Sequence, residues 1–131
     1  MVQQMERKFE LFVKNGSKRK NRTISLNKAN GWSFNTGFYL DNEIKKYKYV
    51  ILGYENNRNE VCFLFTNDEL PGKWKITHRE NSASLSTHSF FNTYNIDANK
   101  FAGRYEPQVY LEPGTGRKMY FISLTEKEQN A

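Results

Sequence analysis

The sequence has 131 residues, of which 37% are hydrophobic and 15% aromatic, and its formal net charge at pH 7 is +6. This length fits one domain, and the apolar fraction is high enough to build a core, which excludes a wholly disordered chain. No apolar run approaches the roughly 20 residues of a membrane-spanning helix, and the first residues lack the apolar stretch of a secretory signal. We therefore expect a single intracellular domain over residues 1–131, with no membrane partner.

The excess of positive charge lies at the N-terminal end. Residues 1–30 contain eight Lys and Arg against two Glu, so this segment alone carries a net charge of +6. The charge centres on Lys18-Arg19-Lys20-Asn21-Arg22, between the strand-like runs 9–13 and 23–26. This pattern predicts a basic hairpin loop whose natural partner is phosphate. The alternative interpretation is a solvated loop whose charges serve only solubility.

Two segments share one order of predicted elements. Residues 22–66 run from an extended piece at 22–26 through a short helix over 33–40 to a hairpin of strands 47–54 and 60–65. Residues 75–124 run from an extended piece at 75–85 through a helix over 86–95 to a hairpin of strands 108–111 and 118–122. Residues 67–74 are the predicted connector, and residues 125–131 are predicted to form a frayed tail.

These two halves are too small to fold separately. Each offers roughly 45 to 50 residues, and domains near 40 residues usually need a metal, disulfides or a partner. We therefore expect the halves to pack against each other as one internal repeat. The predicted fold class is α+β, mainly β with two short helices, arranged as a pseudo-two-fold β-barrel of two β-α-β-β halves.

The order of strand, short helix and hairpin in each half resembles the AbrB/MazE-type DNA-binding fold, in which two copies intertwine as a homodimer. Here residues 24–65 and 83–124 would supply both copies within one chain. The resemblance implies a β-barrel with a basic face that contacts DNA. The chain departs from the family pattern because both helices lack a proline at their start, and basic strand residues occur only in the first half, at Arg22 and Lys28. Another small β-rich architecture with an internal duplication is the alternative.

The candidate nucleic-acid contacts fall into two groups. Lysine and arginine side chains neutralise phosphates, and exposed aromatic rings can stack on bases. The two tryptophans have two open interpretations, as stacking platforms or as core residues. The predicted phosphate anchors are Lys14, Lys18, Arg19, Lys20, Arg22 and Lys28. The predicted second contact strip is Trp32, Lys73, Trp74, Lys75 and Arg79.

Nothing in the sequence forms a catalytic or metal-binding motif. His78 and His88 have no Cys pair and no second histidine at ligand spacing, so structural or surface roles are favoured. The single cysteine, Cys62, lies in an apolar run and is expected in the core. We therefore expect a non-enzymatic protein without metal or cofactor that binds nucleic acid, with DNA favoured over RNA. The alternative is a protein-interaction or inhibitor module, of the phage or mobile-element accessory type, that docks its basic loop on an acidic protein surface.

Overall fold

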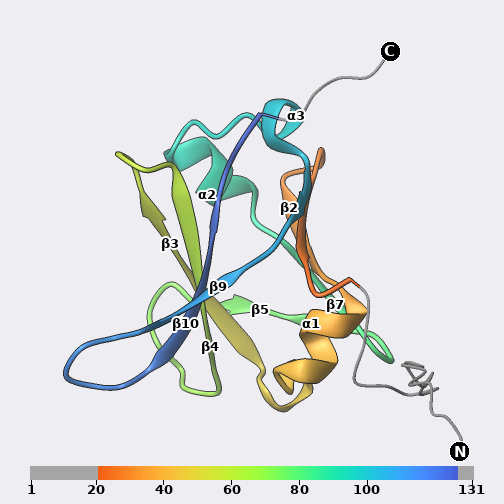
Figure 1. The fold of residues 1–131 in the computed structure, drawn as a ribbon, viewed down its shortest axis with the longest axis vertical. Helices are drawn as coiled ribbons and strands as arrows, with labels where there is room; N and C mark the ends of the chain where they lie inside the picture. Colours follow the sequence, from red (N-terminus) through yellow and green to blue (C-terminus); the bar gives the residue numbers. More distant parts are fainter. Residues whose placement is uncertain (1–20, 127–131) are drawn as a thin grey trace, which may run out of the picture.

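The computed structural model describes residues 21–126, which form two five-stranded antiparallel sheets and three short α-helices (Figure 1). Sheet A has the strand order β6-β7-β2-β1-β8, and sheet B has the order β5-β3-β4-β10-β9. The fold is therefore mainly β with short helices, as the sequence predicted. The elements in chain order are β1 (Ile24–Asn27), β2 (Gly31–Phe34), α1 (Thr36–Asp41), the 3-10 helix η1 (Ile44–Lys46), β3 (Tyr49–Glu55), β4 (Glu60–Thr66), β5 (Trp74–Lys75), β6 (Thr77–His78), β7 (Ala83–Ser86), α2 (His88–Thr93), α3 (Ala98–Phe101), β8 (Gly103–Tyr105), β9 (Gln108–Leu111) and β10 (Lys118–Ser123).

A tight hairpin joins β1 to β2, and the sequence did not predict it. The Asn27 side chain accepts hydrogen bonds from the backbone N–H groups of Ala29 and Gly31, and Asn30 takes a left-handed φ of 62°. These Asx-type bonds close the turn. The helix predicted over 33–40 is therefore wrong at its start, because residues 31–34 form a strand and α1 begins only at Thr36.

The predicted pairing of the strand at 23–26 with residues 9–13 is also wrong. Strand β1 pairs with β2 along one edge and with β8 along the other, so neither edge of it is free for a further strand. The predicted strand at 9–13 itself lies outside the described residues. The pairing of β1 with β2 and β8 therefore excludes the hairpin between residues 9–13 and 23–26 that the sequence pattern favoured.

The two hairpins of sheet B are confirmed. Strand β3 pairs with β4 over seven residue pairs, and Asn59, in the connecting turn, has a φ of 54°. Strand β9 pairs with β10 around the turn at Pro113-Gly114, where Gly114 has a φ of 90°. Both turns carry residue types that tolerate a left-handed backbone, so short-range chemistry sets these hairpins.

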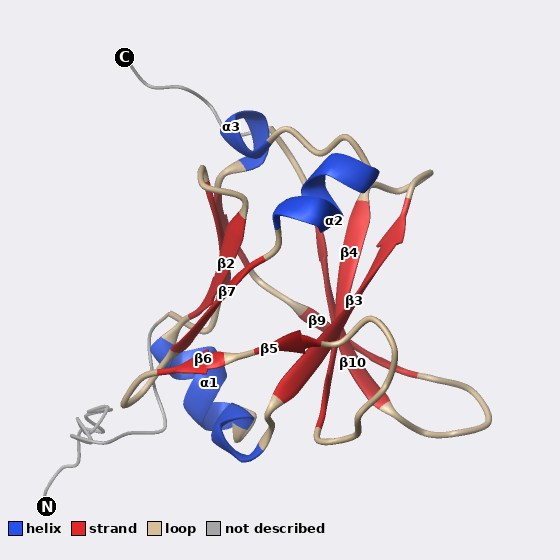
Figure 2. Ribbon diagram, turned by 180° about the vertical axis from the view of Figure 1, so that it is seen from behind, coloured by secondary structure: helices blue, strands red, loops and turns tan. Residues whose placement is uncertain are grey.

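Two stretches of chain pass from one sheet to the other. Strands β5 and β6 lie almost in line and are separated only by Ile76, with β5 in sheet B and β6 in sheet A (Figure 2). Strands β8 and β9 are separated by Glu106 and Pro107, and proline has no N–H to continue a ladder. These interruptions leave two sheets among the described residues, so the closed barrel that we expected is not formed.

The helices are short and lie at the ends of the sheets. The helix predicted over 86–95 is confirmed as α2, while α3 and β8 were not predicted. Asp97 caps α3 by accepting a hydrogen bond from the Asn99 N–H at 3.0 Å. No helix within residues 21–126 is long and apolar enough to cross a membrane.

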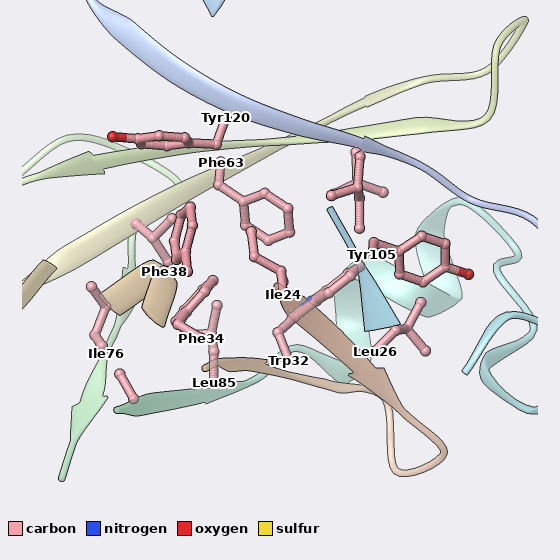
Figure 3. Packing of buried hydrophobic residues seen from close by; sticks show 14 of the residues in the cluster. Ile24, Leu26, Trp32, Phe34, Phe38, Phe63, Ile76, Leu85, Tyr105 and Tyr120 are labelled. Atoms are coloured by element: carbon pink, nitrogen blue, oxygen red, sulfur yellow. The ribbon is translucent and has the colours of Figure 1, made fainter. Parts of the chain in front are cut away.

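The core fills the space between the sheets and consists mainly of aromatic side chains. Figure 3 shows Phe34, Phe38 and Phe63 pointing into this space. Phe34 meets Phe63 edge to face at 5.8 Å between ring centroids, a geometry that aromatic quadrupoles favour. The largest side chains below 2% exposure are Trp32, Tyr39, Phe34, Phe38, Phe63, Phe91, Ile24, Leu26, Ile44, Ile122, Val50 and Val61.

Strand β4 shows how alternation divides its two faces. Val61, Phe63 and Phe65 are buried in the core, whereas Cys62 and Leu64 lie on the outer face of sheet B and are only half-buried. The expectation that Cys62 belongs to the core is therefore wrong, because its strand position points away from the other sheet. Burial nevertheless raises the pKa of the Cys62 thiol.

Candidate nucleic-acid interface

A groove lined by lysines and aromatic rings lies at the edge of sheet B where β5 pairs with β3. We call it the basic groove. Its volume is about 540 Å³, and two of its lining residues, Tyr49 of β3 and Lys75 of β5, lie opposite each other in the strand pairing. Its lining residues are Lys45, Lys46, Tyr47, Lys48, Tyr49, Lys75, Ile76 and His78.

A buried side chain and hydrogen bonds to the backbone hold the lysine-bearing segment 45–48 in place. Ile44 is fully buried at the start of η1, and it follows Glu43, which has a left-handed φ of 53°. The Asn67 side chain accepts from the Lys48 N–H and donates to the Lys46 carbonyl, each at 2.9 Å. The Ile76 N–H then donates to the Lys48 carbonyl at 3.0 Å. The backbone between η1 and β3 is thus fixed on both sides.

His78 links this segment to α1 and has a defined tautomer. Its Nε2 lies 2.7 Å from the Tyr47 carbonyl oxygen, which can only accept, so Nε2 carries the proton. In the neutral imidazole Nδ1 then accepts a hydrogen bond from the Tyr39 hydroxyl at 2.8 Å. Tyr39 is 1% exposed, and burial raises its pKa, so this hydroxyl stays a donor. His78 therefore has a structural role, as the sequence favoured.

Carboxylates neutralise part of the basic groove. The Lys46 ammonium lies 3.5 Å from Glu43, and the Lys73 ammonium lies 3.3 Å from Glu69. The Tyr49 hydroxyl also donates to Glu69, at 2.7 Å. This hydrogen bond, followed by that from Lys73, lowers the pKa of Glu69, and the same bond to Glu69 together with burial raises the pKa of Tyr49. Glu69 is therefore an ionised, hydrogen-bonded rim residue and not a proton donor.

Three lysines of the groove have no salt bridge to a carboxylate within residues 21–126. They are Lys45, Lys48 and Lys75, and all three are exposed. Two further ammonium groups lie over tyrosine rings, that of Lys46 at 5.4 Å from the Tyr47 centroid and that of Lys73 at 5.5 Å from the Tyr49 centroid. The groove therefore combines three ammonium groups that form no salt bridge within the described residues with tyrosine rings, a combination that suits an anionic polymer that also offers flat bases.

The predicted second contact strip is partly brought together here. Lys75 lines the basic groove, and Lys73 lies beside it over the Tyr49 ring. Arg79 follows the groove residue His78 and is exposed at the start of the β6–β7 turn. Trp74 is only half-buried in β5 and packs against the core, so its ring is not a free platform.

Trp32 has to be removed from the predicted contacts. It is 0% exposed, and its ring packs against Phe63 and Phe91 at centroid distances of 5.1 and 5.4 Å. Its Nε1 donates to the Thr87 hydroxyl at 3.0 Å. Of the two interpretations of this residue, only the core one is compatible with that burial.

Arg22 and Lys28, the two predicted phosphate anchors within the described residues, do not line the basic groove. Lys28 is exposed in the β1–β2 turn, next to the Gly31 end of β2, whereas His78 lies opposite Ala83 at the Phe34 end. Arg22 is exposed, and its Nε lies 2.8 Å from the Asp41 carboxylate. Lys14, Lys18, Arg19 and Lys20 lie outside the described residues.

Most residues of the groove were not predicted as contacts. Lys45, Lys46 and Lys48 were not proposed, and Tyr47 and Tyr49 were interpreted as core or rim residues and not as base readers. The interleaved run of basic and aromatic residues at 45–49 is visible in the sequence. It was hidden because the charges of residues 31–131 balance overall, so a segment-wide sum conceals a local cluster.

Within residues 21–126 no group of three or more His, Cys, Asp or Glu side chains is placed to hold a metal ion. The Nδ1 of His88 accepts a hydrogen bond from the Asn30 side chain at 3.1 Å.

No family model, curated protein or solved structure matches this chain. The function therefore has to be argued from the site itself.

Proposed function

We propose that this chain is a small non-enzymatic nucleic-acid-binding protein and that the basic groove holds the phosphate backbone. The observation that carries the proposal is the lining of the groove, in which Lys45, Lys48 and Lys75 occur together with Tyr49. Lysines supply the salt-dependent part of nucleic-acid affinity, and the half-buried Tyr49 ring can supply stacking that tolerates any base, whereas Tyr47 packs against the core beside Phe65.

The rigidity of the groove supports the same function. The hydrogen bonds of Asn67 and His78 to the segment at 46–48 hold the lysine backbone before any ligand arrives. A pre-organised site loses less conformational entropy on binding than a flexible loop does. Long lysine side chains on a fixed backbone can still adapt to the spacing of phosphates.

The basic residues outside the groove form a second proposed contact. Arg22 and Lys28 flank β1 on the exposed surface, and the run Lys18-Arg19-Lys20 precedes Arg22 in the sequence. DNA is favoured over RNA on the resemblance to AbrB/MazE-type proteins, which itself remains a proposal.

We also propose that an internal two-fold relationship connects the halves. The strand pairings support it when β5 and β6 together are taken as the counterpart of β1, and β8 and β9 together as the counterpart of β3. The pair β1–β2 then corresponds to β6–β7, β3–β4 to β9–β10, and β1–β8 to β5–β3. The remaining pairs, β2–β7 and β4–β10, are antiparallel and join each strand to its own counterpart. An internal duplication would produce this pattern.

The test is fluorescence anisotropy of labelled single-stranded and duplex DNA and RNA at two salt concentrations. The variant Lys45→Glu/Lys48→Glu/Lys75→Glu should lose affinity by about tenfold or more and lower the slope of log K against log salt by about 2 to 3. The matched comparison sets Lys45→Glu/Lys48→Glu against Arg58→Glu/Lys118→Glu, which changes the net charge equally at exposed positions outside the groove, and Lys100 is left unchanged because a glutamate there would face Glu126. Equal losses in the two double variants would mean that only overall charge matters and would refute the groove as the site.

A second variant tests the N-terminal run. Lys18→Glu/Arg19→Glu/Lys20→Glu should also weaken binding, whereas Arg22 is left unchanged because a glutamate there would face Asp41. The competing function, docking on an acidic protein, predicts no binding to bare oligonucleotides even at low salt. That result in the unmodified protein would overturn the proposed function.

A further inference from the structure

Strand β9 is an exposed and apolar edge of sheet B. It pairs only with β10 among the described residues, and all four of its residues are exposed. Val109, Tyr110 and Leu111 are 52%, 46% and 61% exposed, and no charged residue falls within the strand. Natural proteins usually protect such an edge with charges, prolines or a covering element, because it is a template for another strand.

The hydrogen-bonding groups of this edge can be assigned residue by residue. The Glu112 N–H donates to Arg117, so residue 112 faces β10, and by alternation residues 110 and 108 do so as well. Val109 and Leu111 therefore direct their N–H and C=O groups outward, where no bonding partner occurs within residues 21–126. The next outward positions on either side, 107 and 113, are prolines and have no N–H.

We propose that β9 pairs with β9 of a second copy of this chain, antiparallel and centred on Tyr110. In this register Val109 lies opposite the partner's Leu111, and these two residues exchange a pair of N–H···O=C bonds. A two-fold axis perpendicular to the sheet keeps equivalent faces of the two copies on the same side of the sheet. The register must therefore be centred on one residue that lies opposite its own copy, and not on the bond between two residues. The strand is thus its own complement in shape and in hydrogen bonding.

Charge and proline positions select this register over its neighbours. Centring on Tyr110 sets the Glu112 carboxylate opposite the partner's Gln108, whose amide can donate to it. Centring on Val109 instead would set Glu112 opposite the partner's Glu106, and like charges directly opposite are destabilising. Centring on Leu111 would set Val109 opposite the partner's Pro113, which has no N–H to donate.

The surroundings of β9 leave room for a second copy. Figure 1 shows the β9–β10 hairpin projecting from the body of the molecule. On the outer face Tyr110 borders an apolar cleft of about 510 Å³, lined also by Met119, Phe121 and Cys62. Pairing would continue sheet B of one copy into sheet B of the other. The basic groove lies at β5, the opposite edge of sheet B, so it stays open in such a dimer.

The strength of this dimer follows from its size. Four residues of edge strand bury far less than the roughly 800 Å² per partner of a typical stable complex. We therefore expect a weak dimer whose mass rises with protein concentration. Sedimentation equilibrium of the full chain measures this directly, and the variant Val109→Lys/Leu111→Lys should remain monomeric because each introduced lysine would meet another across the edge.

Disulfide cross-linking tests the register. In a Cys62→Ser background, Tyr110→Cys places two cysteines at the two-fold axis as a non-hydrogen-bonded pair, whose Cα separation of about 4.5 Å suits a disulfide. The matched control is Gln108→Cys on the same face of the same strand, where the two cysteines would lie about 14 Å apart. Under mild oxidation Tyr110→Cys should form covalent dimer at least tenfold faster than Gln108→Cys.

Two outcomes would overturn the proposal. Equal cross-linking at both positions would indicate random collision, and a monomeric mass of the unmodified chain at every concentration would indicate that β9 does not pair with itself. Circular dichroism of each cysteine variant checks that it is folded, and the mass of the unmodified chain is informative even if a variant is not.

Discussion

The indole Nε1 of Trp32 donates a hydrogen bond to the hydroxyl of Thr87 at 3.0 Å, and it joins two fully buried side chains 55 residues apart in the sequence. Trp32 belongs to β2, and Thr87 is the residue that precedes α2. The bond therefore fixes the start of α2 against sheet A. Because an indole N–H can only donate, the Thr87 hydroxyl is the acceptor that satisfies the buried Trp32 N–H.

Thr87→Val should destabilise the protein by about 1 to 3 kcal/mol, since it leaves the buried indole N–H unsatisfied while conserving shape. Urea denaturation measures the change. Thr93→Val on the exposed end of α2 is the control and should change stability by less than about 0.5 kcal/mol. Equal effects of the two substitutions would show that the Trp32–Thr87 bond contributes nothing.

Gly31→Ala should also destabilise the fold, by about 1 to 3 kcal/mol. An added Cβ would lie 2.7 Å from the backbone carbonyl oxygen of Leu85, and this oxygen belongs to the neighbouring strand and cannot move aside freely. Thermal unfolding gives the measurement. Ser33→Ala in the same strand should leave the melting temperature nearly unchanged, and a Gly31→Ala protein as stable as that control would contradict the close approach of β2 and β7.

His78 should be observed as the Nε2–H tautomer when neutral. The geometry with the Tyr47 carbonyl and the Tyr39 hydroxyl requires it. Long-range nitrogen–proton NMR spectra in mildly alkaline buffer distinguish the two tautomers. Tyr39→Phe should remove the Nδ1 partner at a cost of about 0.5 to 1.5 kcal/mol, whereas Tyr94→Phe at an exposed ring is the control. Observation of the Nδ1–H tautomer would refute the assignment.

Stability should fall as the pH rises from about 10 to 12. Burial, with a smaller effect of Tyr47, raises the pKa of Tyr120 to about 12 from its usual 10.0, and its hydroxyl donates to Asn42. Because the folded-state pKa is raised, the stabilisation is complete below pH 10 and is lost as the pH approaches 12. Denaturation midpoints across this range measure the effect. Tyr120→Phe should weaken the dependence, and an unchanged pH profile in that variant would assign the effect to another group.

Local sequence chemistry determined the two hairpins of sheet B and helix α2. The hairpin turns contain Asn59 or Pro113-Gly114, and the hairpin strands are short runs rich in β-branched and aromatic residues, so the information lies within about ten residues. The β1–β2 hairpin was missed although its turn is also local. Phe34 was assigned to the helix predicted over 33–40, because a short apolar run does not distinguish a strand from a helix.

The tertiary structure alone decided which strands became neighbours and where the basic groove formed. The groove joins residues 45–49 to residues 75–78 through the pairing of β3 with β5, and nothing in either segment specifies the other. The sequence left Trp32 open to a surface or a core position, and only the packing of Phe63, Phe91 and Thr87 around it selected the core. Composition and periodicity act over neighbouring residues, whereas burial depends on the whole set of surfaces that meet when the chain closes on itself.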